Sequence, residues 1–560
     1  MGTLTRVNGP LVEVAGLPGL AMFELVGLGP VRLPGEVVEI RGDRATVQAY
    51  EYTGGLRAGD PATAYGRPLS AGLGPHLLGG VFDGLLRPLS GADVWLTGAR
   101  TPSGGREWRF TPLVTAGDPV DLETPLGEVE TAGAPSYLVL APAAGRVGAI
   151  RPAGPVGPGE PVGRVGGRDV TLLRRWPVRR PMPYRERLEE VVPLTTGQRV
   201  VDLLLPVSRG GTVAVPGGFG TGKTVLLQQI AKWCDADVVV YVGCGERGNE
   251  MAEVVAALAE LADPRTGGRL ADRTVVIANT SNMPMMAREA SIYTGVTVAE
   301  HFRSMGHDAV VIADSTSRWA EARREFASRS GAMPAEEGYP ADLASALAAF
   351  YERAGRVTTL GGRTGSVTVI GAVSPPGGDM TEPVTAHTQR FVRCLWTLDR
   401  DLAYARHYPA VSWSASFARD AEAIAGWHAR EGRPGWGERR ARVASLLAEA
   451  DRLALLAELV GAAALPARER VALLAGRLLR EGVLQQSALS PADAFCDAER
   501  TIALTDAVLG VIGRCEELAA RGVPAGRIEQ SDFSPVLRAK DDAPDPETVR
   551  ARAEGVPGAP

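Results

Sequence analysis

The stretch Gly217-Gly-Phe-Gly-Thr-Gly-Lys-Thr224 decides the fold, because it fits the phosphate-binding pattern G-x-x-x-x-G-K-[ST]. It lies between an apolar run at 212–215 and a segment of helical character that begins near Lys223. Glycines let backbone N–H groups turn toward phosphate oxygens, the helix N-terminus adds a favourable dipole, Lys223 adds positive charge, and the Thr224 hydroxyl can ligate Mg²⁺. A Gly-rich turn without a ligand is the alternative, but the flanking strand and helix favour a nucleotide phosphate site.

Apolar runs around this loop predict a parallel sheet with both faces buried. The runs alternate with helical segments and lie at 212–215, 238–242, 274–278, 309–313 and 367–370. We therefore expect a RecA-like P-loop nucleotide-binding domain over residues 176–418, with its first part at 71–114.

Acidic residues follow two other strands of this predicted sheet. Asp314 ends one run and could hold the water shell of Mg²⁺, although an acidic residue that caps the next helix would look the same. Glu246 follows another run and is a candidate to orient an attacking water, although a glutamate at a helix start is also an ordinary cap. Arg247 could contact a phosphate or pair with Glu250. Since the carboxyl ends of parallel strands meet at one edge of a sheet, we expect these residues beside the loop.

The remaining segments differ from one another in residue pattern. Together with the nucleotide-binding domain, they predict a multidomain α/β fold. Short alternating apolar runs broken by glycines predict an N-terminal β-barrel over 1–70, and a Gly/Pro-rich stretch predicts an inserted small β domain over 115–175. Ala, Leu, Arg and Glu at helical spacing predict a C-terminal helical domain over 419–540. The polar, Pro-bearing end predicts a flexible tail over 541–560.

Composition narrows the class of partners. The 560 residues carry a net charge of -5, so no global basic field attracts a nucleic-acid backbone, and no nucleic-acid partner is expected. Neither a secretory signal nor a run of about 18 apolar residues is found, so a membrane link would depend on partners. The five cysteines form no C-x-x-C pair and the six histidines have no ligand spacing, which favours reduced thiols and a metal bound only through the nucleotide.

Longer strings make the chain resemble, over nearly its whole length, the catalytic A (alpha) subunit of V-type or A-type ATPases and ATP synthases. These strings are FDGLLRP at 82–88, WPVRR at 176–180, TGQRVVD at 196–202, GCGERGNEM at 243–251, IANTSNMP at 277–284, REASIYTG at 288–295, ADSTSRWAEA at 313–322, EEGYP at 336–340, AFYERAG at 349–355 and AVSPPGGDMTEPVT at 372–385. The segment 115–175 also falls where this family carries an insertion that its F-type relatives lack.

The resemblance implies catalytic roles for four side chains. Lys223 and Arg247 would bind phosphates, Glu246 would hold the water, and Arg318 would also face the phosphate. The loop residues implied to bind the nucleotide are Gly217, Gly218, Phe219, Gly220, Thr221, Gly222, Lys223, Thr224 and Val225.

The resemblance also implies residues for the metal and the base of ATP or ADP. Thr224 would ligate Mg²⁺, and Asp314 and Glu250 would hold its water shell. Tyr408 and Phe495 stand where the family stacks aromatic rings on adenine, although both could be ordinary core aromatics.

Some positions depart from the family pattern. Leu489 replaces a Phe, so the adenine pocket should be less aromatic, and Ser412 and Ala418 replace the usual Asp, Asn or His and the usual Ser. Asp342 and Ala346 replace a Tyr and an Arg after EEGYP. Nucleotide affinity and subunit contacts are the properties that these replacements affect.

At the level of the assembly, the resemblance implies ATP hydrolysis or synthesis coupled to transport of H⁺ or Na⁺ across a membrane. The chain would alternate with B subunits in an A₃B₃ ring, and each B would donate an arginine in trans. A central shaft, a peripheral stalk and an ion-translocating sector would hold the ring at the cytoplasmic face of a membrane, in a prokaryote.

Three other functions compete with this interpretation. A homohexameric secretion-type ATPase would supply its own trans arginine, for which Arg419 is suitably placed, although the insertion and the Gln485-Gln-Ser-Ala488 stretch oppose it. A non-catalytic nucleotide-binding ring subunit is opposed by the intact Lys223, Thr224, Glu246 and Asp314. An RNA-translocating ring helicase is opposed by the acidic balance.

Overall fold

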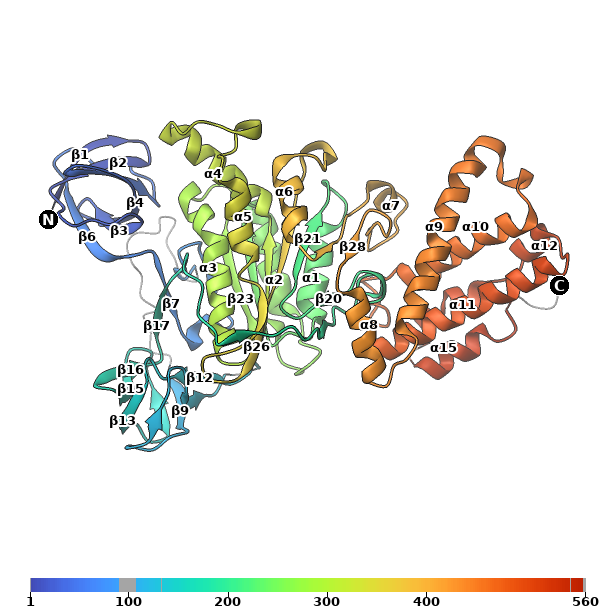
Figure 1. The fold of residues 1–560 in the computed structure, drawn as a ribbon, viewed down its shortest axis with the longest axis horizontal. Helices are drawn as coiled ribbons and strands as arrows, with labels where there is room; N and C mark the ends of the chain where they lie inside the picture. The colour runs from blue at the N-terminus through green and yellow to red at the C-terminus, as the bar shows by residue number, and fades with distance from the viewer. Residues whose placement is uncertain (1, 90–106, 132, 544, 557–560) are drawn as a thin grey trace.

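The computed structural model describes residues 2–89, 107–131, 133–543 and 545–556. Figure 1 shows a barrel near the N-terminus, a small β module beside it, a central sheet with helices and a helical part at the other end. Residue 1, residues 90–106 of the predicted segment 71–114, residue 132 of the predicted insertion, and residues 544 and 557–560 of the predicted tail lie outside the described residues.

The N-terminal barrel forms because its strands alternate inward apolar and outward polar side chains. Its strands are β1 (Gly2–Asn8), β2 (Leu11–Ala15), β3 (Glu24–Leu28), β4 (Leu33–Arg41), β5 (Arg44–Ala49) and β6 (Pro61–Pro68). They close in the order β1-β2-β5-β4-β3-β6 around a core of its own. Closure leaves no unpaired sheet edge, and the predicted N-terminal barrel is confirmed.

The predicted small β domain consists of two four-stranded sheets. One has the order β10 (Pro119–Val120), β13 (Gly145–Ile150), β15 (Pro161–Val165) and β16 (Arg168–Thr171). The other has the order β12 (Tyr137–Leu140), β11 (Pro125–Val129), β9 (Trp108–Pro112) and β14 (Gly154–Val156). Because β9 pairs with both β11 and β14, this module begins at least seven residues before the predicted 115. After it, β17 (Arg174–Pro177) pairs with β7 (Ser70–Leu73).

The central sheet is mostly parallel, as predicted. Its main order is β28 (Phe417–Ala418), β27 (Cys394–Leu395), β21 (Thr212–Pro216), β26 (Thr364–Val373), β24 (Asp308–Asp314), β22 (Val238–Cys244), β23 (Thr274–Asn279) and β8 (Val81–Phe82). Antiparallel β25 (Gly355–Thr358) and β18 (Glu186–Arg187) extend it from β26, and β19 (Pro193–Leu194) pairs separately with β20 (Val207–Ser208). All five apolar runs that the sequence singles out are strands here.

Helices cover both faces of this sheet. They are α1 (Lys223–Trp233), α2 (Gly248–Glu260), α3 (Met285–Ser304), α4 (Thr316–Ser330), α5 (Leu343–Tyr351), α6 (Pro383–Phe391) and the short α7 (Arg400–Tyr404). In β22, Val239 and Tyr241 share a core with side chains of α1 and α2, whereas Val238 and Val240 share one with α3 and α5. Two buried faces explain why the strand is apolar throughout.

Ion pairs connect the barrel to the nucleotide-binding part. The Tyr50 hydroxyl donates to Glu36 at 2.7 Å, and Arg179 bridges Glu36 at 3.2 Å and Glu289 of α3 at 2.7 Å. Arg323 of α4 contacts the same Glu289 at 3.1 Å. Glu36 and Glu289 are buried, so losing these guanidinium partners would leave them without a counter-charge inside the protein.

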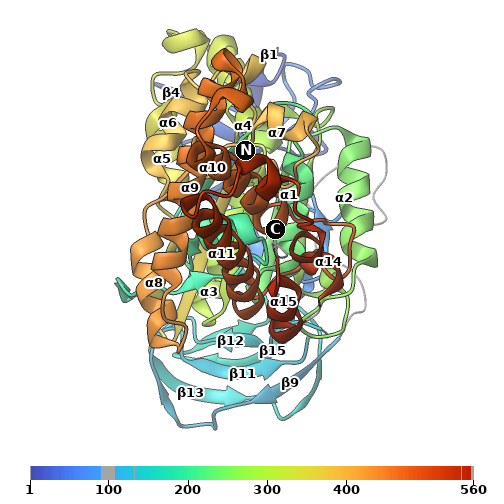
Figure 2. The same cartoon turned by 90° about the vertical axis from the view of Figure 1, so that its right-hand side faces the viewer.

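The C-terminal part is helical, as predicted. Its helices are α8 (Ala421–Arg430), α9 (Trp436–Val460), α10 (Ala467–Leu479), α11 (Ala498–Ala520), α12 (Ala525–Glu529), α13 (Ser534–Leu537), α14 (Ala539–Asp542) and α15 (Pro546–Ala553). Figure 2 views this bundle end-on, with α11 and α15 side by side. Figure 1 places the two ends of the chain at opposite ends of the molecule.

A flexible tail over 541–560 is the wrong description of residues 545–556. There, Asp545 caps α15 by accepting from the Thr548 N–H at 2.8 Å, and Val549 is completely buried. Arg514 of α11 donates to the carbonyls of Ala553 and Val556, both at 2.7 Å. The Asp-Pro pair starts a helix here, since proline at the first helical position lacks only an N–H that would be unpaired anyway.

Candidate functional site

The phosphate loop connects β21 to α1 and presents a helix N-terminus without a side-chain cap. Gly220 and Gly222 both have left-handed φ values, +80° and +82°, which favour glycine. A Cβ at Gly222 would also lie 3.2 Å from the Tyr408 ring, so two constraints require glycine there. Open N–H groups at a helix start suit an anion such as a phosphate.

The Lys223 ammonium lies against the strand ends that flank the loop. It donates to the Val373 carbonyl at 3.3 Å, to the Gly217 carbonyl at 3.4 Å and to the Ser374 hydroxyl. Burial lowers the pKa of Lys223, and the nearby Asp314 carboxylate opposes that effect. Sequence reasoning misses Ser374, whose only signal is its position directly after the central strand β26.

An acidic and hydroxyl cluster lies beside the loop. The Thr224 hydroxyl is 3.5 Å from Asp314 Oδ2, and the Tyr241 hydroxyl donates to the same oxygen at 3.2 Å. Burial raises the pKa of Asp314, which is 3% exposed at the end of β24. Oxygen ligands of this kind are those that Mg²⁺ prefers, so Thr224 and Asp314 fit a nucleotide-bound Mg²⁺. Glu250 lies in the first turn of α2, within 3.9 Å of Arg247.

Glu246 lies two residues after the end of β22, at the same edge of the sheet. Its carbonyl accepts from the Ser281 N–H at 2.9 Å, and the preceding Gly245 N–H donates to the Asn279 carbonyl at 2.7 Å, so the turn is held in place. The pKa of the Glu246 carboxyl is raised to about 7, first because burial disfavours the charge and then because Asp314 is near. A carboxyl with that pKa can accept a proton near neutral pH.

The arginines lie on the open side of this cluster. Arg318, in the first turns of α4, pairs with Glu321 at 2.9 Å and keeps 47% of its side chain exposed. Arg247 is 72% exposed and lies 3.9 Å from Glu250. Arg419 is exposed and stacks over the Phe417 ring at 5.4 Å. The structure therefore gathers Lys223, Thr224, Glu246, Asp314 and Arg318, and leaves Arg247 and Arg419 facing solvent.

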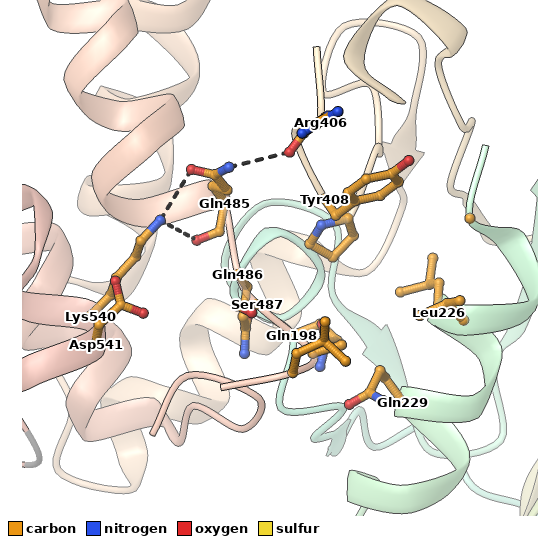
Figure 3. A pocket seen from close by; sticks show the side chains of 15 residues that line it. Gln198, Leu226, Gln229, Arg406, Tyr408, Gln485, Gln486, Ser487, Lys540 and Asp541 are labelled. Carbon is orange, nitrogen blue, oxygen red and sulfur yellow. Dashed lines mark hydrogen bonds between the residues drawn. The ribbon is translucent and has the colours of Figure 1, made fainter. Parts of the chain in front are cut away.

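A cavity of about 600 Å³ adjoins the phosphate loop on the side of Tyr408, which is a residue predicted to contact the nucleotide base (Figure 3). Val225 and Tyr408 line it as predicted residues, and Leu489 lines it with 94% of its surface exposed. Phe495 does not line this cavity, because its ring stacks on Trp233 with the centroids 5.1 Å apart. Gly222 lines the cavity as well, and the lining residues that the sequence does not predict are Gln198, Leu226, Gln229, Arg406, Pro409, Gln485, Gln486, Ser487, Ala488, Lys540 and Asp541.

No helix in the described parts of the chain is long and apolar enough to cross a membrane.

Comparison with protein families gives three consecutive matches. Residues 4–66 match the beta-barrel domain of the ATP synthase alpha/beta family, residues 197–418 match the nucleotide-binding domain of that family, and residues 425–517 match the C-terminal domain of V and A type ATP synthase.

Whole-length relatives agree with these matches. The chain is 53% identical to the V-type ATP synthase alpha chain of Anaeromyxobacter dehalogenans (strain 2CP-C), over 93% of this chain and 92% of that one. It is 49% identical to the V-type ATP synthase alpha chain of Nitrosococcus oceani, over 94% and 91%. It is 45% identical to the A subunit of the A-type ATP synthase of Thermococcus kodakarensis, over 98% and 97%.

Among solved structures, the chain resembles the assembled ATPase EscN of the enteropathogenic E. coli type III secretion system. The TM-score is 0.66 with 21% identity, and the match covers 91% of this chain and all of that one. At this identity the likeness concerns the fold alone. Sequence identity of 45–53% over nine-tenths of the length instead identifies the chain as a member of the family of catalytic A subunits, also called alpha chains, of V-type and A-type ATP synthases.

Proposed function

We propose that this chain cleaves or forms the terminal phosphate bond of ATP by in-line transfer to or from a water held at Glu246. The observation that carries the proposal is the position of Glu246, whose pKa is about 7, beside the half-buried Lys223 and the buried Asp314 at one sheet edge. In hydrolysis, the Glu246 carboxylate orients the water and receives its proton. Charge that develops on the phosphate oxygens is stabilised by Lys223 and by the N–H groups of the loop.

On the metal side, Thr224 would ligate Mg²⁺, and Asp314 and Glu250 would hold its water shell. The ion would supply positive charge that neutralises the phosphate oxygens. Asp314 also fixes the Thr224 hydroxyl on the side of the loop where those oxygens lie. Arg318 and Arg247 are exposed, so each can exchange its pairing with Glu321 or Glu250 for a bound phosphate.

The neighbouring subunits complete the site. The open side that carries Arg318 and Arg247 is proposed to face a B-type subunit of an alternating A₃B₃ ring, which donates a further arginine. Shaft and stalk subunits would connect the ring to an ion-translocating sector, at the cytoplasmic face of a prokaryotic membrane. This proposal rests on the whole-length relatives, which are prokaryotic subunits of V-type and A-type ATP synthases.

Partner dependence tests the proposal. We expect the chain alone to bind Mg-ATP but to hydrolyse it slowly, and a B-type partner from the same organism to raise turnover about a thousandfold or more, because an arginine in trans contributes that much in related phosphoryl transfers. Size-exclusion chromatography and a steady-state ATPase assay measure both properties. A homohexamer of this chain that is fully active alone would instead support a secretion-type ATPase that uses Arg419.

The pH dependence of kcat/KM is a second expected result. Above pH 7 the Glu246 carboxyl is ionised and can accept a proton, whereas below pH 7 it is protonated and cannot. We therefore expect kcat/KM of the reconstituted ring to fall about tenfold from pH 8 to pH 6, with Mg²⁺ in excess. A flat profile across this range, with the ring intact by chromatography, contradicts the role of Glu246 as the base.

A further inference from the structure

The end of the chain reaches the nucleotide cavity. Lys540 and Asp541 of α14 line its wall, opposite the side formed by α1 and Tyr408 (Figure 3). Lys540 is 9% exposed, so its ammonium is held inside the protein rather than in solvent. A charge in that position needs several acceptors to be stable.

The Lys540 ammonium is satisfied by the segment that forms the adjacent cavity wall. It donates to the Glu481 carbonyl at 2.7 Å, to the Gln485 carbonyl at 3.3 Å and to the Gln485 side-chain oxygen at 3.2 Å. Arg199 also donates to the Gln485 carbonyl, at 2.7 Å, and so fixes the backbone there. Besides its two contacts with carbonyls, Lys540 donates to the side-chain oxygen of Gln485, and this hydrogen bond orients the Gln485 amide.

The Gln485 amide continues to the loop that carries Tyr408. Its Nε2 donates to the Arg406 carbonyl at 3.3 Å, as Figure 3 shows. Arg406 has a φ of +56°, a left-handed conformation that is unfavourable for a non-glycine residue and persists only where neighbours hold it. One residue on, the Gln486 N–H donates to the Tyr408 carbonyl at 2.8 Å. The Tyr408 ring is therefore placed by contacts from the C-terminal part of the chain.

Lysine is rare in this protein, which makes its use at 540 informative. Of the 60 lysine and arginine residues, only Lys223, Lys232 and Lys540 are lysines. A compact ammonium on a flexible stem has three rotatable donors, which here reach two carbonyls and a side-chain oxygen. Lys223 and Lys540 both use the group in this way, on the phosphate side and on the base side of the same site.

We propose that Lys540 is a positioning residue for the nucleotide base, because through Gln485 it holds the Arg406–Tyr408 loop as a wall of the cavity. The inference rests on the proposed nucleotide site. It assigns to the last helical segments of the chain a share in nucleotide affinity, while the phosphate loop binds its phosphates independently of them.

Comparing how the full-length chain binds two different ligands distinguishes a role of Lys540 in positioning the base from a general effect on protein stability. Mg-ADP uses both sides of the site, whereas Mg-pyrophosphate uses only the phosphate side. For Lys540→Met we expect calorimetric Mg-ADP affinity to fall about tenfold, the effect of losing one charged hydrogen bond. Mg-pyrophosphate affinity should change by less than about twofold, and the matched Lys232→Met variant should bind both ligands like the wild type.

The Gln485→Leu variant is an independent test, because it leaves Lys540 in place. It should show the same selective loss, and combining it with Lys540→Met should add little, because both changes interrupt one chain of contacts. If Lys540→Met does not fold in a thermal unfolding scan, Gln485→Leu decides alone. Equal loss of both ligands, or loss of neither, overturns the role of Lys540. A wild-type chain that binds neither ligand would instead overturn the proposed nucleotide site, and this inference with it.

Discussion

Replacing Glu246 with glutamine is expected to lower the turnover of ATP about a hundredfold to ten-thousandfold, the range that a positioned base contributes, with little change in Mg-ATP affinity. The two side chains have the same shape, so the turn held by Ser281 and Asn279 should persist. The amide cannot accept the proton of the attacking water, which is why the chemical step should fail while binding remains. Steady-state hydrolysis by the reconstituted ring and equilibrium binding of Mg-ATP measure the two quantities.

A matched substitution controls for loss of charge near the site. Glu253 lies on the exposed side of α2, seven residues after Glu246, and Glu253→Gln should have normal turnover. Undiminished turnover in Glu246→Gln would remove Glu246 from the mechanism. A parallel loss of Mg-ATP binding would mean that Glu246 shapes the site rather than acting on the water.

Replacing Lys223 with methionine is expected to weaken Mg-ATP binding about tenfold to hundredfold, and to lower turnover further. Its ammonium is the buried positive charge nearest the loop carbonyls, and hydrogen bonds from charged groups contribute about 1.5–3 kcal/mol each. The same charge stabilises the transferring phosphate, so kcat should fall in addition to affinity. Methionine retains the apolar stem, and the temperature of unfolding should change little, since burial already disfavours the ammonium.

Lys232→Met again provides the control, because Lys232 is on α1 with its ammonium over the Trp233 ring, 4.6 Å from the centroid. Binding of Mg-ATP by calorimetry and turnover by the reconstituted ring should both be normal in that variant. If Lys223→Met bound Mg-ATP like the wild type, the loop would hold phosphate through its N–H groups alone.

Local sequence patterns predict those site residues that follow the end of a single strand. The phosphate loop, Asp314 and Glu246 follow recognisable apolar runs, and the parallel sheet brings their ends together. Ser374 and Tyr241 are missed because their contacts, with Lys223 and Asp314, cross between strands far apart in the chain. No pattern within one strand specifies a partner in another.

Other features of the site that the sequence does not predict also depend on tertiary packing. Phe495 has the right residue type and place for a base contact, but the nearby Trp233 provides a stacking partner on the other side. The end of the chain is polar in composition, yet a few apolar positions such as Val549 are enough to pack α15 against α11. Lys540 lines the cavity from α14, where its carbonyl accepts a hydrogen bond from Arg500 of α11.

The charged bridge from Glu36 through Arg179 to Glu289 and Arg323 has a mechanical consequence for the working ring. Sliding the barrel against α3 and α4 would break the ion pair between Glu36 and Arg179, and a buried carboxylate that loses its partner costs about 3–5 kcal/mol. The barrel and the catalytic sheet should therefore move together as one rigid body. Any bending that accompanies nucleotide exchange is then confined to the opposite side, where the helical bundle meets the sheet through Arg199 and the wall of the base cavity. A spectroscopic label placed on the barrel would therefore follow movements of the whole catalytic sheet, but it would not detect changes of shape within that sheet.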